Sequence, residues 1–280
     1  MERIQILRRA TELDEGSLSF LEGGAGPPVI LLHGVPTSAE LWRGSLPMFV
    51  RVGYHCAAPD LPGYGFTRLR PSADHSLTGC ARLLDRWLEA ERHDRAWVVG
   101  HDLGGLVAQL LAVRAPQRVT RLTLINSVAA EHWPALRARL SSVAAKLGLY
   151  QPAARLRIVP NPFVRWQIRR SFSDPGLASR QLQNRVVWDT KVTSPEGREA
   201  FQRHLAALSW REAGHLAAEL PRLRCPVDIV WGMEDPFQRW DPVALALCAS
   251  LPSAHVTQLH GCGHFPPIEA SQRMVEALLR

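Results

Sequence analysis

The sequence lacks the features that assign a chain to a membrane, a metal site or a disulfide framework. No apolar run approaches the ~20 residues that cross a bilayer, and residues 1–10 lack the apolar core of a signal peptide. The five cysteines are odd in number and lack the spacing of metal ligands. We therefore expect free thiols, no metal or other cofactor, and a cytoplasmic protein that does not bind membranes.

Lysine is also scarce, so the net charge of +7 comes almost wholly from arginine, because Lys146 and Lys191 are the two lysines. The arginines are scattered, as in residues 136–139 and 166–170, whereas a nucleic-acid site clusters them with exposed aromatic side chains. A solvated basic surface is the better interpretation, and no nucleic-acid partner is expected. A length of 280 residues and a hydrophobic content of 46% fit a globular enzyme with an insertion.

The most informative stretch is Gly100-His101-Asp102-Leu103-Gly104, which follows an apolar run at residues 96–99 and precedes helically spaced leucines. Strand, tight turn and helix are the form of a nucleophile elbow. Glycines are needed two positions before and after the centre, because a Cβ there would strike neighbouring backbone. Asp102 is then lifted to the top of the sheet. The simpler interpretation is an aspartate that only caps the following helix.

An aspartate at this position constrains the chemistry. Its carboxylate, with a reference pKa of about 3.9, is ionised at neutral pH without help from a base. It attacks esters and amides weakly, but it can displace a halide or open a strained epoxide at a saturated carbon. The product is a covalent ester on Asp102 that water must then hydrolyse.

The alternation of strands and helices predicts the fold. Helices between the strands, including 39–50 and 77–90, indicate a mostly parallel, eight-stranded sheet flanked by helices, with ligands at the carboxyl ends of the strands. We interpret residues 128–220, which show no clear strand, as a helical cap inserted after the sixth strand of a core formed by 1–127 and 221–280. The expected strands are 4–7, 17–21, 29–32, 54–58, 96–99, 121–126, 226–231 and 255–259.

Two loops at these carboxyl ends carry candidate partners for Asp102. Asp235 follows the seventh strand and is the candidate acid, with Glu131 as the alternative. His264 lies in a glycine-rich loop after the last strand and is the candidate base. The order along the chain is therefore nucleophile, acid, base.

A third loop, residues 33–38, supplies a candidate oxyanion hole. It follows a fully apolar strand, and its backbone lies beside the elbow if the two strands are neighbours. We expect the N–H groups of Val35 and Leu103 to stabilise negative charge on the reacting carboxylate.

This order and its sequence context resemble the α/β-hydrolase fold family. Within that family, an aspartate nucleophile directly after Gly-His is similar to the branch of epoxide hydrolases and haloalkane dehalogenases. The resemblance implies that His264, oriented by Asp235, activates the water that hydrolyses the ester. It covers nearly the whole chain and is carried by residues 33–36, 60–65, 100–104, 232–236 and 261–265.

The cap and the edge of the core predict a pocket for a small hydrophobic organic substrate. The alternative for the cap aromatics is that they only join cap helices to the core. A homodimer is compatible with the sequence. The candidate substrate-binding residues are His33, Trp42, His101 and Phe265 of the core and Trp133, Tyr150, Trp166 and Trp188 of the cap.

The residues expected to stabilise a leaving group depart from the patterns of both enzyme families. Haloalkane dehalogenases hold the halide with a tryptophan after the nucleophile and often an asparagine after His-Gly, where this chain has Leu103 and Val35. Epoxide hydrolases use two cap tyrosines to protonate the epoxide oxygen. The cap of this chain has one tyrosine, Tyr150, with His132 or a tryptophan N–H as the alternative second donor. We expect epoxide opening first and dehalogenation second. A non-hydrolytic lyase, cyclase or ligand-binding role is the third alternative, and a serine-type esterase is disfavoured.

Overall fold

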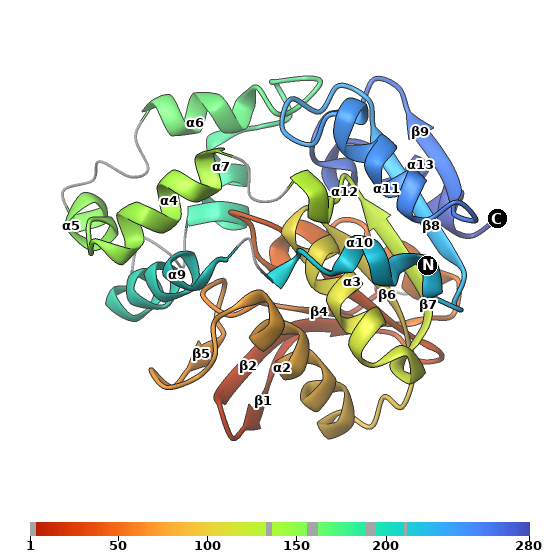
Figure 1. Ribbon diagram of the computed structural model, residues 1–280, viewed down its shortest axis with the longest axis horizontal. Helices are drawn as coiled ribbons and strands as arrows, with labels where there is room; N and C mark the ends of the chain where they lie inside the picture. The colour runs from red at the N-terminus through yellow and green to blue at the C-terminus, as the bar shows by residue number, and fades with distance from the viewer. Residues whose placement is uncertain (1–3, 133–135, 156–161, 189–193, 210–211) are drawn as a thin grey trace.

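The computed structural model describes residues 4–132, 136–155, 162–188, 194–209 and 212–280, and Figure 1 shows their arrangement. A nine-stranded sheet runs through the molecule and helices cover both of its faces (Figure 1). Within the described ranges, no helix combines the length and the apolar character needed to cross a bilayer.

The sheet is mixed, with an antiparallel start and a parallel remainder. Strands β1, β2 and β4 pair antiparallel, and every later neighbour along the path from β4 to β9 is parallel. The strand order is β1-β2-β4-β3-β6-β7-β8-β9, with β5 paired to β2. The strands are β1 (Leu7–Leu13), β2 (Gly16–Gly23), β3 (Pro28–Leu32), β4 (His55–Pro59), β5 (Arg68–Leu69), β6 (Ala96–His101), β7 (Val119–Ile125), β8 (Val227–Gly232) and β9 (His255–Leu259).

The mostly parallel sheet is confirmed, and two details of the prediction are wrong. The first strand is Leu7–Leu13 rather than 4–7, because it forms a hairpin with β2 in which Leu13 pairs with Gly16. Its polar sequence fits an edge strand whose side chains are largely exposed. The short strand β5 is a ninth strand that the sequence did not predict.

Alternation of side chains along the parallel strands builds two cores, one on each face of the sheet. In β3, Ile30 and Leu32 belong to one core, whereas Val29 and Leu31 belong to the other. Successive side chains of a strand point to opposite faces, so a fully apolar strand is the signature of a sheet covered on both sides. All four side chains are buried.

The helices divide between these faces. The first core packs against α2 (Leu77–Ala90), α3 (Leu103–Arg114) and α11 (Leu245–Ser250). The second packs against η1 (Ala39–Trp42), α1 (Leu46–Arg51) and α13 (Ser271–Leu278). Shorter elements are η2 (Pro116–Arg118), η7 (Trp240–Ala244) and α12 (Pro266–Glu269).

The single helix expected at 39–50 is wrong, because the structure has η1 and α1 there instead. Pro47 lies in the first turn of α1. Proline has no N–H and its ring clashes with the carbonyl four residues earlier, so a helix cannot run through it from Trp42 without a break.

Between β7 and β8 the described residues form helices and turns. Figure 1 shows α4, α5, α6, α7 and α9 grouped on the left side of the molecule, apart from α2, α3 and α11 of the core. The elements are η3 (Ala130–His132), α4 (Leu136–Lys146), α5 (Tyr150–Arg155), α6 (Pro162–Arg169), α7 (Arg180–Gln183), η4 (Asn184–Trp188), α9 (Pro195–Ala207), α10 (Leu216–Glu219) and η6 (Leu220–Arg222).

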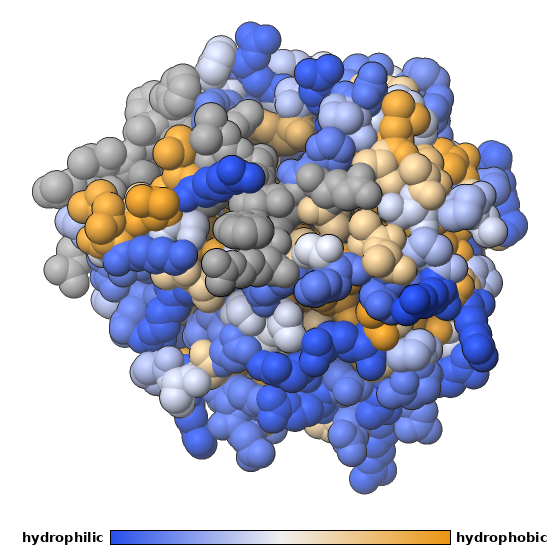
Figure 2. Space-filling view, viewed as in Figure 1, coloured by the Kyte–Doolittle hydropathy of each residue, from blue (hydrophilic) through white to orange (hydrophobic). Residues whose placement is uncertain are grey.

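This insertion also carries exposed apolar side chains. Leu140, Val143 and Leu147 recur at helical spacing along α4 and its C-terminal turn, and all three are exposed. Hydrophobic side chains accordingly gather at the left of Figure 2, over α4 and α5.

Candidate active site

The turn between β6 and α3 places Asp102 in a backbone conformation that few residues adopt. Its φ is 50° and its ψ is −119°, so it lies in the positive-φ half of the Ramachandran plot, which L-residues other than glycine seldom occupy. A Cβ on Gly100 would lie 2.5 Å from Gly104 O, and a Cβ on Gly104 would lie 2.3 Å from His33 O. The tight turn therefore requires both glycines, and a strained residue of this kind is typical of functional sites.

Each carboxylate oxygen of Asp102 accepts one hydrogen bond. The Val35 N–H donates to Oδ2 at 3.0 Å, and the Gln238 Nε2 donates to Oδ1 at 2.9 Å. Gly34 leaves the space for this, because a Cβ there would lie 2.6 Å from Oδ2. Leu103 begins α3, so its N–H belongs to the first turn, whose donors have no acceptor within the helix. The structure thus brings Val35, Leu103 and Asp102 together.

The candidate acid and base form a buried pair. His264 Nδ1 lies 2.7 Å from Asp235 Oδ2, and the two side chains are 3% and 1% exposed. A carboxylate only accepts hydrogen bonds, so Nδ1 carries the proton. In the neutral imidazole this assigns the lone pair to Nε2, the atom that a general base uses.

Three further donors fix Asp235. Asn126 Nδ2 donates to Oδ2 at 2.8 Å, and the N–H groups of Phe237 and Gln238 donate to Oδ1 at 2.7 and 3.0 Å. Asn126 is itself held by Gly232, whose N–H donates to Asn126 Oδ1 at 2.8 Å. Sequence reasoning missed Asn126, although a polar residue directly after the apolar strand β7 was a usable signal.

Neighbouring charges set the protonation of His264. Burial lowers its pKa, but the negative charges of Asp235 and Asp102 outweigh that effect, and the net pKa is raised above 6.5. His101 behaves oppositely, since burial and the nearby His264 lower its pKa to about 4. Neutral His101 can therefore donate from Nε2 to the His264 carbonyl, 2.7 Å away.

The loop that carries His264 is also fixed by the insertion. The His264 N–H donates to Ser171 O at 2.8 Å. The Phe265 ring lies 4.8 Å from the His264 ring and 4.9 Å from the Phe172 ring, centroid to centroid. His101 and Phe265, both predicted to bind substrate, thus lie directly beside the candidate base.

Two other core residues predicted to bind substrate have mainly structural surroundings. His33 Nε2 accepts the Leu61 N–H at 3.0 Å, and its Nδ1 lies 3.1 Å from Gly34 O. Trp42 is fully buried in the second core, and its indole N–H has no hydrogen-bond partner among the described residues. Their roles in substrate binding stay predictions.

The predicted cap aromatics are spread apart. Tyr150 is buried in α5, whereas Trp166 is half-exposed on α6 and lines a separate open groove of about 600 Å³. His132 is exposed. Trp133 lies outside the described residues, as do the side chains of Trp188 and of Glu131, the alternative acid.

Tyr64, which sequence reasoning missed, lies within electrostatic reach of Asp102 and packs against the same phenylalanine ring as Tyr150. Tyr64 is buried, and the negative charge of Asp102 adds to burial in raising its pKa. The Phe201 ring lies between the tyrosines, with its centroid 5.4 Å from Tyr64 and 5.0 Å from Tyr150. The signal was the turn Pro62-Gly63-Tyr64-Gly65, which follows a strand of the sheet.

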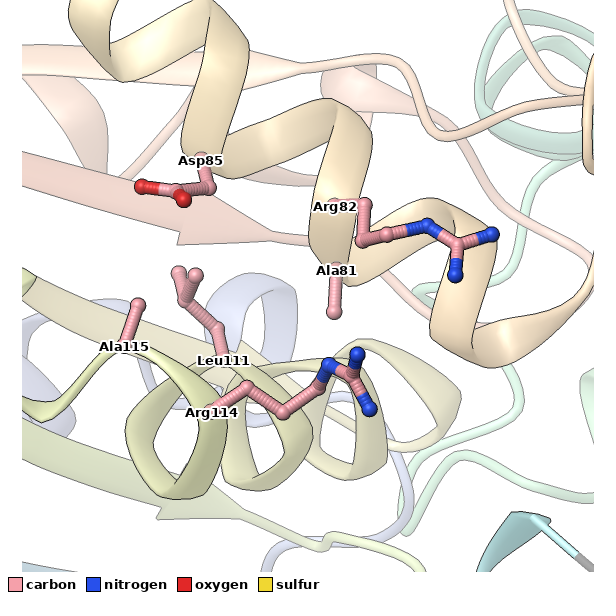
Figure 3. Close-up of a pocket in the computed structure, with 6 residues that line it drawn as sticks. All are labelled: Ala81, Arg82, Asp85, Leu111, Arg114 and Ala115. Carbon is pink, nitrogen blue, oxygen red and sulfur yellow. The ribbon is translucent and has the colours of Figure 1, made fainter.

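A second hollow, of about 330 Å³, lies between α2 and the far end of α3 (Figure 3). Figure 3 shows Arg82 and Arg114 directed to one end of it and Asp85 at the other. Asp85 is paired with Arg118, at 2.7 Å. This hollow is remote from Asp102, so we do not assign it to the candidate active site. Across the described ranges, no three His, Cys, Asp or Glu side chains are grouped to hold a metal ion.

A family model described as "alpha/beta hydrolase fold" matches residues 27–271. The chain is 26% identical to haloalkane dehalogenase 2 of Mycobacterium tuberculosis, over 94% of this chain and 91% of that protein.

Solved structures show the same fold. An α/β hydrolase fold protein from Burkholderia ambifaria has a TM-score of 0.84 at 24% identity, covering 99% of both chains. The epoxide hydrolase CorEH has a TM-score of 0.77 at 23% identity, covering 98% of both chains. The predicted fold is confirmed, and the chain belongs to the α/β-hydrolase fold family.

Proposed function

We propose that this hydrolase uses Asp102 as a nucleophile and forms a covalent ester with a hydrophobic substrate, most readily an epoxide that it opens to a diol. The observation that carries the proposal is the elbow aspartate, with an N–H donor on each carboxylate oxygen, facing a buried His264–Asp235 pair. A helix-capping aspartate would instead accept from its own helix, and Asp102 makes no side-chain capping bond to α3.

In the first half of the reaction, Asp102 Oδ1 attacks a carbon of the epoxide and the carbon–oxygen bond breaks. The freed oxygen takes a proton from a phenol. Tyr150 fits this role, because burial raises its pKa and keeps it protonated, and its hydroxyl has no hydrogen-bond partner among the described residues. The product is a hydroxyalkyl ester of Asp102.

In the second half, His264 Nε2 takes a proton from water, and the hydroxide attacks Cγ of the ester. The N–H groups of Val35 and Leu103 stabilise the oxyanion on Oδ2, an effect worth about 3–4 kcal/mol per donor in a serine hydrolase. The Cγ–Oδ1 bond then breaks, and the departing diol oxygen takes the proton from His264. The proton released when Asp102 ionises again restores the phenol.

The charge on Asp102 links ester formation to the ester hydrolysis that follows it. In the free enzyme the negative charge of Asp102 contributes to the raised pKa of His264. Ester formation removes that charge, so the pKa of His264 falls. The neutral, basic form of the imidazole is therefore favoured at the stage where a base is required.

We also propose that residues 128–220 form a cap over the site. Ser171 contacts the backbone of His264, and Val186 O accepts from Ser38 Oγ at 3.2 Å, next to the loop that carries Val35. Because these contacts lie on two loops at the carboxyl ends of strands, the insertion can both exclude water and shape the substrate pocket.

Dehalogenation is the second candidate function, and the likeness to a haloalkane dehalogenase favours it. It uses the same ester but needs donors for the departing halide. Leu103 and Val35 have apolar side chains at the two positions where such donors are expected, which supports the epoxide first.

The test is the intact mass of His264→Gln after incubation with styrene oxide or 1-bromohexane. We expect an adduct on Asp102 that retains the whole epoxide, or one that has lost bromide if dehalogenation is the reaction. The matched control is the double variant with Asp102→Asn, which should form no adduct. Failure of the folded single variant to react with either probe would contradict the proposal and favour a non-hydrolytic role.

A further inference from the structure

Gln238 contacts both the candidate nucleophile, Asp102, and the candidate acid, Asp235. Its backbone N–H donates to Asp235 Oδ1 at 3.0 Å, and its carbonyl accepts from Trp231 Nε1 at 2.8 Å. These two backbone contacts fix the residue, and its side chain reaches across to Asp102, where Nε2 donates to Oδ1 at 2.9 Å. Since a carboxylate offers no donor, the NH2 end of the amide must face Asp102.

The two oxygens of Asp102 have different roles in the proposed reaction, on which this inference rests. Oδ2 accepts the Val35 N–H, so it is the oxygen that bears the negative charge of the tetrahedral intermediate. Oδ1 is then the oxygen that attacks the substrate and later leaves with the product. Gln238 is therefore the donor to the oxygen whose bonds are made and broken.

The charge on Oδ1 changes in opposite directions during ester formation and ester hydrolysis. During attack, Oδ1 turns from a charged carboxylate oxygen into a neutral ester oxygen, so the hydrogen bond from Gln238 weakens. During hydrolysis, the Cγ–Oδ1 bond breaks and Oδ1 leaves as the alkoxide of the product, until the proton on His264 neutralises it. Hydrogen bonds to charged groups are about twice as strong as bonds between neutral groups.

We propose that Gln238 is a catalytic residue that assists hydrolysis of the Asp102 ester by donating to the departing oxygen. The same contact slightly opposes the first attack, because it stabilises the charged carboxylate. Asp102 is 7% exposed, so little water competes for this hydrogen bond. The amide is neutral and adds no positive charge that would lower the pKa of His264.

The test separates the two halves kinetically. Gln238→Met removes the donor but keeps the length of the side chain and both backbone contacts, so Asp235 stays fixed. Gln238→Leu removes it with a different shape and serves if the methionine variant folds poorly. The matched control is Gln258→Met, at an exposed position of β9.

Each variant retains His264 and is mixed with whichever of styrene oxide and 1-bromohexane is trapped by His264→Gln. We expect decay of the ester to slow on the order of 100-fold, the scale of a lost oxyanion donor. The ester should accumulate by intact mass, and kcat and KM should fall together while kcat/KM is unchanged or higher. A merely structural role would lower kcat/KM as well.

Equal ester decay in Gln238→Met and the wild type would overturn the inference, as would a parallel loss of kcat and kcat/KM without accumulated ester. If His264→Gln traps an adduct and the Gln238 variants do not accumulate one, only this inference fails. If His264→Gln traps nothing, the proposed function fails with it.

Discussion

Replacing Asp235 by asparagine should stop the reaction halfway. Asp235 accepts four hydrogen bonds, from His264 and Asn126 on Oδ2 and from the backbone of Phe237 and Gln238 on Oδ1. Asparagine offers one oxygen and one NH2. The backbone donors cannot turn away, so the oxygen faces them and the NH2 faces His264. The imidazole must then accept at Nδ1 and carry its proton on Nε2.

This change of tautomer sets the size of the expected loss in kcat. A base with its proton on the reacting nitrogen cannot take one from water, and the corresponding change in a serine protease lowers kcat about 10⁴-fold, or about 5 kcal/mol. Attack by Asp102 does not need the base, so we expect ester formation to stay within about tenfold. Lost bonds to a buried carboxylate should lower the free energy of unfolding by about 3 kcal/mol.

The assay compares Asp235→Asn with the wild type and with Asp14→Asn, which lies in an exposed turn. Intact mass after addition of styrene oxide should show accumulated ester only in the first variant, and urea unfolding measures its stability. Turnover within tenfold of the wild type in a folded Asp235→Asn protein would refute the reasoning. A large loss in Glu131→Gln instead would transfer the role of the acid to that residue.

Three further predictions concern protonation and the elbow. NMR titration should find the pKa of His264 above 6.5 in the free enzyme and lower in Asp102→Asn, because one of the charges that raise it is gone; an unchanged pKa would contradict this. The stability that this raised pKa contributes is complete below pH 6.5, the pKa of an unperturbed histidine. It is lost as pH rises from there through the raised pKa of the folded protein. Gly104→Ala should lower the free energy of unfolding by about 3 kcal/mol through its backbone clash, whereas Gly44→Ala, whose Cβ meets nothing within 4 Å, should be nearly neutral. Burial lowers the pKa of His204 to about 3. Because the unfolded chain then binds a proton that the buried imidazole does not, the free energy of unfolding should fall by about 1.4 kcal/mol per pH unit as pH drops below 6.5. His204→Leu should flatten that pH dependence in urea titrations between pH 5 and 7.

The local patterns of the sequence were sufficient for the fold and for the candidate nucleophile. Fully apolar strands such as 29–32 require a sheet covered on both faces, and the glycines around Asp102 permit little except a tight turn. These inferences succeed because they depend on neighbours within a few residues. The prediction failed where the pattern was ambiguous, as at the polar edge strand β1 and at the helix interrupted before Pro47.

Only the tertiary structure decided which distant residues meet. Asn126 lies 109 positions from Asp235, Gln238 lies 136 positions from Asp102, and neither belongs to a motif that reveals its partner. Their contacts exist because parallel strands bring the carboxyl ends of β6, β7 and β8 to the same edge of the sheet. The sequence alone determined an elbow carrying an aspartate and the order of its candidate partners along the chain. The fold decided which donors surround that aspartate, because hydrogen bonds between loops depend on strand neighbours, and those are a property of the whole sheet.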